Sequence, residues 1–232
     1  VEQKKMRQWS MRITAYADRL LKGLDNIDWT DAIKDTQRNW IGKSQGASIF
    51  FKTNGDKKHT IEVFTTRPDT IFGVSFIVLA PEHELVQKIT TKNQEKEIKK
   101  YQNTSRKKTE RERISNVKIT TGAFTGAYAI HPFTNKKIPI WIGDYVLANY
   151  GTGAVMSVPC GDQRDWEFAK HFSLEIPNVF KDKDLSKGAF TEKDAVITNS
   201  DFLDGLTVKK ATKLAISHIE KKGCGKGKTQ YK

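Results

Sequence analysis

The sequence predicts an α+β fold: a small, β-barrel-like, mostly antiparallel core with surrounding helices, plus a helical N-terminal extension. Short runs of β-branched and aromatic residues recur from residue 47 onward and are separated by turn residues. The expected strands outnumber the helices and do not alternate with them, which argues against a parallel α/β sheet. We therefore expect a helical extension over residues 1–45, a main domain over residues 46–222 and a flexible tail over residues 223–232.

The composition is that of a globular chain that attracts polyanions. Its 232 residues and 37% apolar content permit an ordinary packed core. No stretch approaches the ~20 consecutive apolar residues of a membrane span, and the first residues do not resemble a secretory signal. Two cysteines are too few for a disulfide framework, so we expect a cytoplasmic protein. The net charge of +13 favours a nucleic-acid partner, although a solvated lysine-rich surface explains it as well.

Two helices are expected in the N-terminal extension. Apolar residues recur at helical intervals over the first 29 residues and predict one amphipathic helix, with a face formed by Trp9, Ile13, Tyr16, Leu20 and Leu24. A second, shorter helix can begin near Asp28 or Thr30, where acidic and hydroxyl residues supply capping, and end near Gly42.

Strand candidates fill the middle of the chain. They lie at residues 47–53, 59–66, 73–80, 127–133, 136–147 and 153–159. Between the third and fourth, residues 82–114 are polar and predict a surface helix followed by a poorly buried excursion. Two further amphipathic helices are expected at residues 162–172 and 206–223, the last of them ending at Gly223.

Several patterns suggest a chemistry that their spacing does not support. The segment "GCGKGKT", residues 223–229, has Lys222 where a phosphate loop needs its first glycine, and it follows a helix rather than a strand. The segment "YGTGAVM" lacks the third glycine of a dinucleotide site. No two of the five histidines are spaced to share a helix face, and Cys160 is expected to be a buried filler. We expect neither a metal site nor a cysteine nucleophile.

The segment "TTRPDT", residues 65–70, concentrates hydroxyl groups at a strand end. Pro68 disfavours helical geometry at Arg67, so Thr65 and Thr66 should finish the strand and project from a turn. Threonine is also common in ordinary strands and turns. Residue type alone therefore leaves a functional and a purely structural interpretation open.

A second segment, "GTGAVMSVPCGDQRDWEFA", opens a helix with Asp162 and Asp165 near its positive end, where an ordinary cap would also be acidic. Together and in this order, the two segments resemble the signature of the editing insertion of leucyl-tRNA synthetases. The resemblance covers nearly the whole chain: residues 46 to about 222 are similar to the insertion, and the preceding stretch is similar to the one that leads out of the catalytic core. The HIGH and KMSKS signatures are absent, so the chain resembles a fragment that cannot charge tRNA.

The resemblance implies a hydrolase that removes wrong amino acids from tRNA-Leu. One methylene in an apolar pocket is worth only ~1–3 kcal/mol, which is too little for accurate translation, so a second pocket hydrolyses the mischarged ester. Norvalyl, isoleucyl or methionyl groups are expected to enter, while Thr70 excludes leucyl. The implied partners are the 3′ acceptor end of tRNA-Leu and the rest of the synthetase. No cofactor or metal is implied, and a monomer is expected.

The resemblance also implies roles for individual residues. Asp165 is similar to the aspartate that pairs with the α-ammonium of the ester, with Asp162 supporting it. Thr65 and Thr66 would hold the attacking water, the ester or the terminal ribose. The remaining substrate contacts are expected from Phe64, Arg67, Leu147, Tyr150, Met156 and Val158.

None of these residues is a strong nucleophile or a tuned base, so we expect attack by a positioned water molecule. Many members of the family carry a histidine before the first aspartate of the motif, but this chain has Gly161, so no histidine base is available there. Two alternatives stay open. One is a non-catalytic module that docks the acceptor end of tRNA, and the other is a module that binds adenosine-containing small molecules without turnover.

Overall fold

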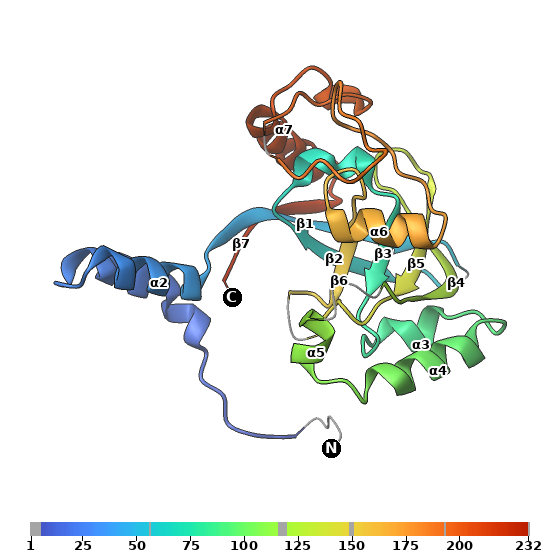
Figure 1. Ribbon diagram of the computed structural model, residues 1–232, viewed down its shortest axis with the longest axis horizontal. Coiled ribbons are helices and arrows are strands. Elements are labelled where there is room, and N and C mark those ends of the chain that lie inside the picture. Colours follow the sequence, from blue (N-terminus) through green and yellow to red (C-terminus); the bar gives the residue numbers. More distant parts are fainter. Residues whose placement is uncertain (1–5, 56, 116–119, 149–150, 193, 232) are drawn as a thin grey trace.

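The computed structural model describes residues 6–55, 57–115, 120–148, 151–192 and 194–231. A curved β sheet forms the body, helices surround it, and two helices near the N-terminus project from one end as an arm (Figure 1). The predicted α+β class is confirmed. The strands are β1 Ser44–Thr53, β2 Thr60–Thr65, β3 Phe76–Leu79, β4 Ala123–Ile130, β5 Lys137–Ile142, β6 Ala154–Ser157 and β7 Gly225–Gln230.

Helices cover the sheet and form the arm. The α-helices are α1 Ala17–Gly23, α2 Asp31–Ile41, α3 Leu85–Ile89, α4 Glu95–Ser105, α5 Glu110–Ser115, α6 Gln163–His171 and α7 Val208–Lys221. Short 3-10 helices are η1 Ile13–Tyr16, η2 Leu24–Asn26, η3 Pro68–Gly73 and η4 Asp201–Leu203. Within the described residues, no helix is long and apolar enough to cross a membrane.

The sheet is mostly antiparallel, as predicted, and curls without closing. Its order is β2-β1-β4-β5-β3-β6, and β7 pairs with the first half of β1. Only the β3–β5 pair is parallel among the described pairs. The end strands β2 and β6 approach each other, but no hydrogen-bonded ladder joins them in the described part of the chain. The barrel therefore has an open seam between β2 and β6.

Two apolar layers hold the body together, one on each face of the sheet. The layer inside the curl is the larger and includes Ile49, Phe51 and Ile140. The second layer lies between the sheet and α6, where the rings of Phe76 and Phe168 stack with centroids 4.9 Å apart. Fully burying a side chain of this size stabilises a fold by about 1.5–3 kcal/mol. All four residues of β3 are buried because both faces of that strand are covered, which explains its unbroken apolar run.

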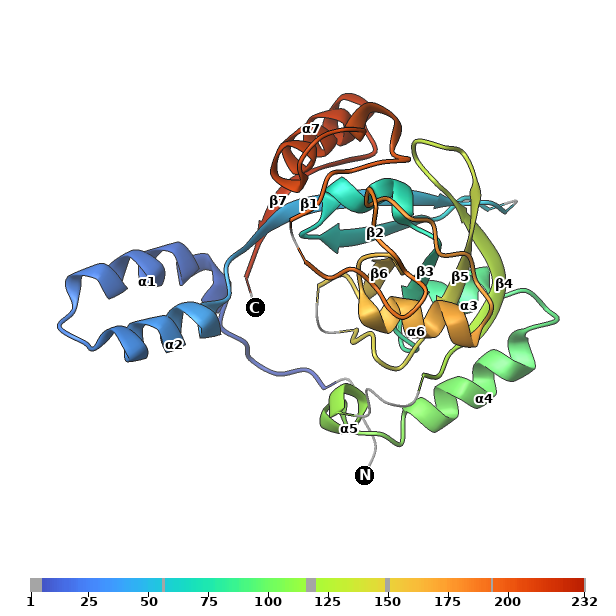
Figure 2. The same cartoon turned by 45° about the horizontal axis from the view of Figure 1, so that its top comes forward.

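The arm differs from the sequence prediction at its start. From residue 6, where the described chain begins, the first helical residue is Ile13, and Trp9 lies fully exposed outside any helix. Of the five residues predicted to share an apolar face, only Leu24 is buried. The second helix is confirmed: α2 starts after Thr30 and ends where Gly42, with φ of 59°, donates its N–H to the Arg38 carbonyl. In Figure 2, α1 and α2 lie side by side.

The segment predicted as one surface helix and an excursion folds into three helices, α3, α4 and α5 (Figure 2). The excursion is not poorly buried throughout, because Arg113 of α5 is enclosed and pairs with Glu82 at 2.7 Å. Arg113 also donates to the carbonyl oxygens of Asp144, at 2.5 Å, and Val146, at 2.8 Å. One buried guanidinium thus ties α5 to the loop that follows β5.

The prediction of a flexible tail is wrong for Gly225–Gln230, which form β7. This strand pairs antiparallel with β1 over the register Ser44↔Gln230 to Ile49↔Gly225. Its glycines suggested flexibility, but Gly225 is needed because a β-carbon there would collide with the Ser48 carbonyl. Gly223 does end the preceding helix as expected, with φ of 67°.

Candidate active site at the barrel seam

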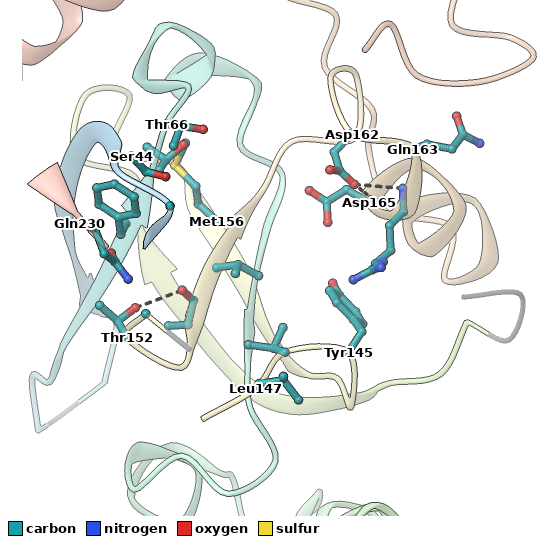
Figure 3. Close-up of a pocket in the computed structure, with 18 of the residues that line it drawn as sticks. Ser44, Thr66, Tyr145, Leu147, Thr152, Met156, Asp162, Gln163, Asp165 and Gln230 are labelled. Carbon is teal, nitrogen blue, oxygen red and sulfur yellow. Dashed lines mark hydrogen bonds between the residues drawn. The ribbon is translucent and has the colours of Figure 1, made fainter. Parts of the chain in front are cut away.

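A cavity of about 890 Å³ lies at the seam of the curled sheet. Its described walls come from the ends of β2 and β7, strand β6, the loop after β5 and the start of α6. Seven of the predicted site residues line it: Phe64, Thr65, Thr66, Leu147, Met156, Asp162 and Asp165. Figure 3 shows Thr66 and Met156 on one side and the two aspartates on the other.

The threonine wall is built by a tight turn at the end of β2. The Thr65 hydroxyl accepts a hydrogen bond from the Arg67 N–H at 3.0 Å, and Pro68 then opens η3. Gly46 of β1 allows β2 to come close, because a β-carbon there would collide with the Thr65 carbonyl. The backbone that carries the Thr65 and Thr66 hydroxyls is therefore fixed both by this turn and by the close approach of β1.

Arg67 forms an ion pair with a buried carboxylate. Its guanidinium donates to both oxygens of Asp69, which is fully buried and also accepts from Thr212 of α7 at 3.3 Å. Arg67 also lies 5.8 Å from the ring of Phe180. Its positive charge is committed to structure, and Arg67 is not among the described lining residues.

Thr70 and Val158 also lie outside the described lining. Thr70 is 3% exposed, and its hydroxyl donates to the Arg67 carbonyl at 2.8 Å. Val158 packs toward η3, since a β-carbon on Gly73 would lie 3.1 Å from its side chain. The specificity role of Thr70 stays a prediction. Tyr150, another predicted substrate contact, lies outside the described residues.

The carboxylate wall is the first turn of α6. Asp162 is its N-cap, accepting from the N–H groups of Arg164 at 2.9 Å and Asp165 at 3.1 Å. Asp165 accepts from the Val158 N–H at 2.8 Å and is 8% exposed. These hydrogen bonds fold the chain between β6 and α6 back on itself and bring both carboxylates to the wall of the cavity.

Asp165 is electrostatically unusual. Burial raises its pKa to about 7, and the nearby charge of Asp162 adds to the rise, while the bond from Val158 N–H opposes it. An exposed aspartate is fully ionised at neutral pH, whereas Asp165 changes its charge there. A carboxyl group with such a shift, on the wall of a cavity, is a candidate functional group.

Sequence reasoning missed several residues that line the cavity. Gln163 and Arg164 lie between the two aspartates, so the second motif contained them, whereas Tyr145 lies outside both motifs, two positions before Leu147. Gln230 reaches the cavity through β7 (Figure 3). Nothing in the glycine-rich tail indicated that position.

The chemistry of the cavity is that of hydroxyls and carboxylates. Its described lining contains no histidine, cysteine or lysine. Cys160 is buried, and burial raises the pKa of its thiol to about 11, which suits the predicted filler rather than a nucleophile. Among the described residues, no group of three or more metal-ligating side chains occurs. The arrangement can bind an ammonium group at the carboxylates and hold water or ester oxygens at the threonines.

The sequence profile of the family described as leucyl-tRNA synthetase, editing domain, matches residues 38–220. The chain belongs to this family. It is 60% identical over its whole length to a leucine–tRNA ligase of Christiangramia forsetii and 58% identical to one of Flavobacterium johnsoniae. It spans about a quarter of the length of these curated relatives, 24% and 25% respectively.

A solved structure shares the fold. It is that of a leucyl-tRNA synthetase of Agrobacterium radiobacter in a ternary complex with tRNA and LeuAMS, with a TM-score of 0.77 and 32% sequence identity. The match covers 97% of this chain and 25% of that chain. The structural likeness therefore extends to the arm as well as to the sheet.

Proposed function

We propose that the chain is a post-transfer editing hydrolase that deacylates mischarged tRNA-Leu. The observation that carries the proposal is the pairing, in one cavity, of the hydroxyls of Thr65 and Thr66 with the buried carboxylate of Asp165. Membership of the editing-domain family supports it. The substrate is an ester that carries a norvalyl, isoleucyl or methionyl group.

In the proposed reaction Asp165 binds the α-ammonium group and so orients the ester. Water, positioned by Thr65 and Thr66, attacks the carbonyl carbon. The ester C–O bond breaks and leaves the free amino acid and a ribose hydroxyl. Positioning carries most of the rate, since an aminoacyl ester is already labile and the described lining offers no strong base. Leu147 and Met156 supply apolar contacts.

Thr70 is proposed to exclude leucine. Since Thr70 does not line the described cavity, this role requires the branched leucyl side chain to reach η3 behind the threonine wall. The Thr70→Ala variant should then hydrolyse correctly charged leucyl-tRNA at a measurable rate. A variant that spares the leucyl ester as fully as the parent does shows that the assignment to Thr70 is wrong.

The principal test is a deacylation assay with norvalyl-tRNA and leucyl-tRNA side by side. The parent chain should hydrolyse only the norvalyl ester, and Asp165→Ala should abolish that hydrolysis while circular dichroism shows an unchanged fold. Asp184→Ala is the matched control, because it removes an exposed aspartate that is not among the described lining residues of the cavity. Unchanged turnover by Asp165→Ala contradicts the proposed role.

The net charge of +13 favours one other function, a module that docks the acceptor end of tRNA without chemistry. Such a module would bind norvalyl-tRNA and leave its ester intact. In both cases the proposed partners are the 3′ end of tRNA-Leu and the rest of the synthetase, and the proposed location is the cytoplasm. The exposed tryptophans of the arm support a contact with the rest of the synthetase.

A further inference from the structure

Two hydroxyl groups beside Asp165 are buried without a well-formed hydrogen bond to any described residue. They are the Oγ of Ser157 and the phenolic oxygen of Tyr145. Buried polar atoms in proteins are nearly always paired, so an unpaired one calls for an explanation. Two such atoms that both adjoin one functional carboxylate point to a shared role.

Ser157 occupies a position where an apolar residue is expected. It ends β6, is fully buried, and stands opposite Phe76 of β3 in the ladder. The Ser75 N–H donates to the Ser157 carbonyl at 3.1 Å, so its backbone cannot drift. Side chains alternate along a strand, which places Ser157 on the same face as Val155, toward the apolar layer under α6. A hydroxyl in that layer has Asp165 of α6 as its polar neighbour.

Tyr145 is held in place by its ring. The ring packs edge-on against Phe168 with centroids 6.1 Å apart, and the guanidinium carbon of Arg164 lies 5.3 Å from its centre. Figure 3 shows the Tyr145 hydroxyl directed toward the start of α6, where Asp165 stands. Burial raises the pKa of Tyr145 well above its usual value, and the charge of Asp165 adds to this, so its hydroxyl keeps its proton and can only donate or accept as a neutral group.

The carboxylate of Asp165 has room for a further donor. One of its oxygens accepts the Val158 N–H, and an ionised carboxylate offers about four acceptor positions in all. The nearby Ser157 hydroxyl lowers the pKa of Asp165, against the larger effects of burial and of Asp162. The same Ser157 hydroxyl also lowers the pKa of Tyr145, so it lies close to both groups.

The charged groups around Asp165 are few. From its own helix, Asp162 opposes ionisation and Arg164 favours it weakly. Glu167 of α6 also lines the cavity and adds negative charge. Arg67, in the turn after β2, is also nearby, since its charge and that of Asp165 both act on Cys160. The guanidinium of Arg67 is, however, paired with Asp69. Neutral donors must therefore supply much of the stabilisation of the Asp165 carboxylate.

We propose that Ser157 and Tyr145 are positioning residues that act through Asp165: Tyr145 donates to Ser157, Ser157 donates to the carboxylate, and this relay keeps Asp165 ionised and turned toward the substrate ammonium. The inference rests on the proposed editing function for its substrate. The proposed effect on the ionisation of Asp165 is independent of the editing function, because that ionisation can be measured without any reaction.

The test compares Ser157→Ala, Tyr145→Phe and the double variant, each of which removes only a hydroxyl or two. The first readout is the titration midpoint of the Asp165 carboxyl carbon by ¹³C NMR. Ser157→Ala should raise the midpoint by about one pH unit, because a hydrogen bond to a charged group contributes about 1.5 kcal/mol or more and one unit corresponds to about 1.4 kcal/mol. Tyr145→Phe should raise it by less, since Tyr145 acts through Ser157. The double variant should match Ser157→Ala alone.

The second readout is the pH profile of kcat/KM for norvalyl-tRNA. Only the ionised Asp165 binds the ammonium, so the rate should rise with pH through the Asp165 midpoint and level off above it. Ser157→Ala should shift this rise to higher pH by the same amount as the NMR midpoint, roughly a tenfold loss below the midpoint for each pH unit. The plateau at high pH should change little.

Ser105→Ala is the matched control, because Ser105 of α4 also has a buried hydroxyl without a partner among the described residues but is not among the groups that shift the pKa of Asp165. It should leave the Asp165 midpoint unchanged. An unmoved midpoint in Ser157→Ala, or an equal shift in Ser105→Ala, overturns the proposal, and additive shifts in the double variant overturn the relay. If the midpoint moves as expected but the parent leaves norvalyl-tRNA intact, the relay stands and the editing function fails.

Discussion

The arm and the sheet body carry similar amphipathic patterns and meet opposite environments. In the body, Phe168 is fully buried between α6 and the sheet, whereas Trp40 of α2 in the arm is 80% exposed. The arm is held together by polar contacts, such as the 3.0 Å ion pair between Arg38 and Asp25, on a largely exposed surface. The difference teaches that an apolar pattern stabilises a fold only where a second surface covers it.

The largest effect that this comparison predicts is at the core of the body. Phe168→Ala should lower the free energy of unfolding by about 3–5 kcal/mol, because it empties a site that packs against Phe76, Trp141 and Phe172. Urea denaturation followed by circular dichroism measures the change. Phe168→Leu, which keeps most of the volume, is the control and should lose clearly less. Equal losses in both variants contradict the cavity explanation.

A smaller effect is expected at the start of α6. Asp162→Ala removes the cap that accepts two backbone N–H groups, which should cost about 1 kcal/mol in the same unfolding experiment. Asp162→Asn keeps an accepting oxygen and should lose less than the alanine variant. A loss as large as that of Phe168→Ala would show that Asp162 does more than cap the helix.

The smallest effect belongs to the arm. Trp40→Ser should change the free energy of unfolding of this chain by no more than about 0.5 kcal/mol, because the side chain is exposed. The measurement is again the urea midpoint. A destabilisation of several kcal/mol would contradict the contrast between arm and body, since it would mean that Trp40 is covered in solution. The result therefore decides whether the arm contributes to the stability of the isolated chain.

Elements with local causes were predicted well from the sequence. Gly42 ends α2, Asp162 caps α6 and Gly223 follows α7, and each does so through hydrogen bonds or backbone angles within one turn. The strands β1 to β6 were also located, although β4 starts at Ala123, earlier than predicted. The start of the arm was not, because helical periodicity does not reveal whether an apolar face will be covered.

The sequence by itself determined the helix ends, the strands and the two motifs, since caps, turns and alternation depend on neighbours a few residues apart. Only the tertiary structure decided that the glycine-rich end becomes β7 and that the curled sheet leaves a seam between β2 and β6. That seam brings Thr65 to the same cavity as Asp165, a hundred positions later in the chain. Pairing between strands that are distant in sequence depends on which surfaces can be buried together. A local sequence pattern does not specify that pairing.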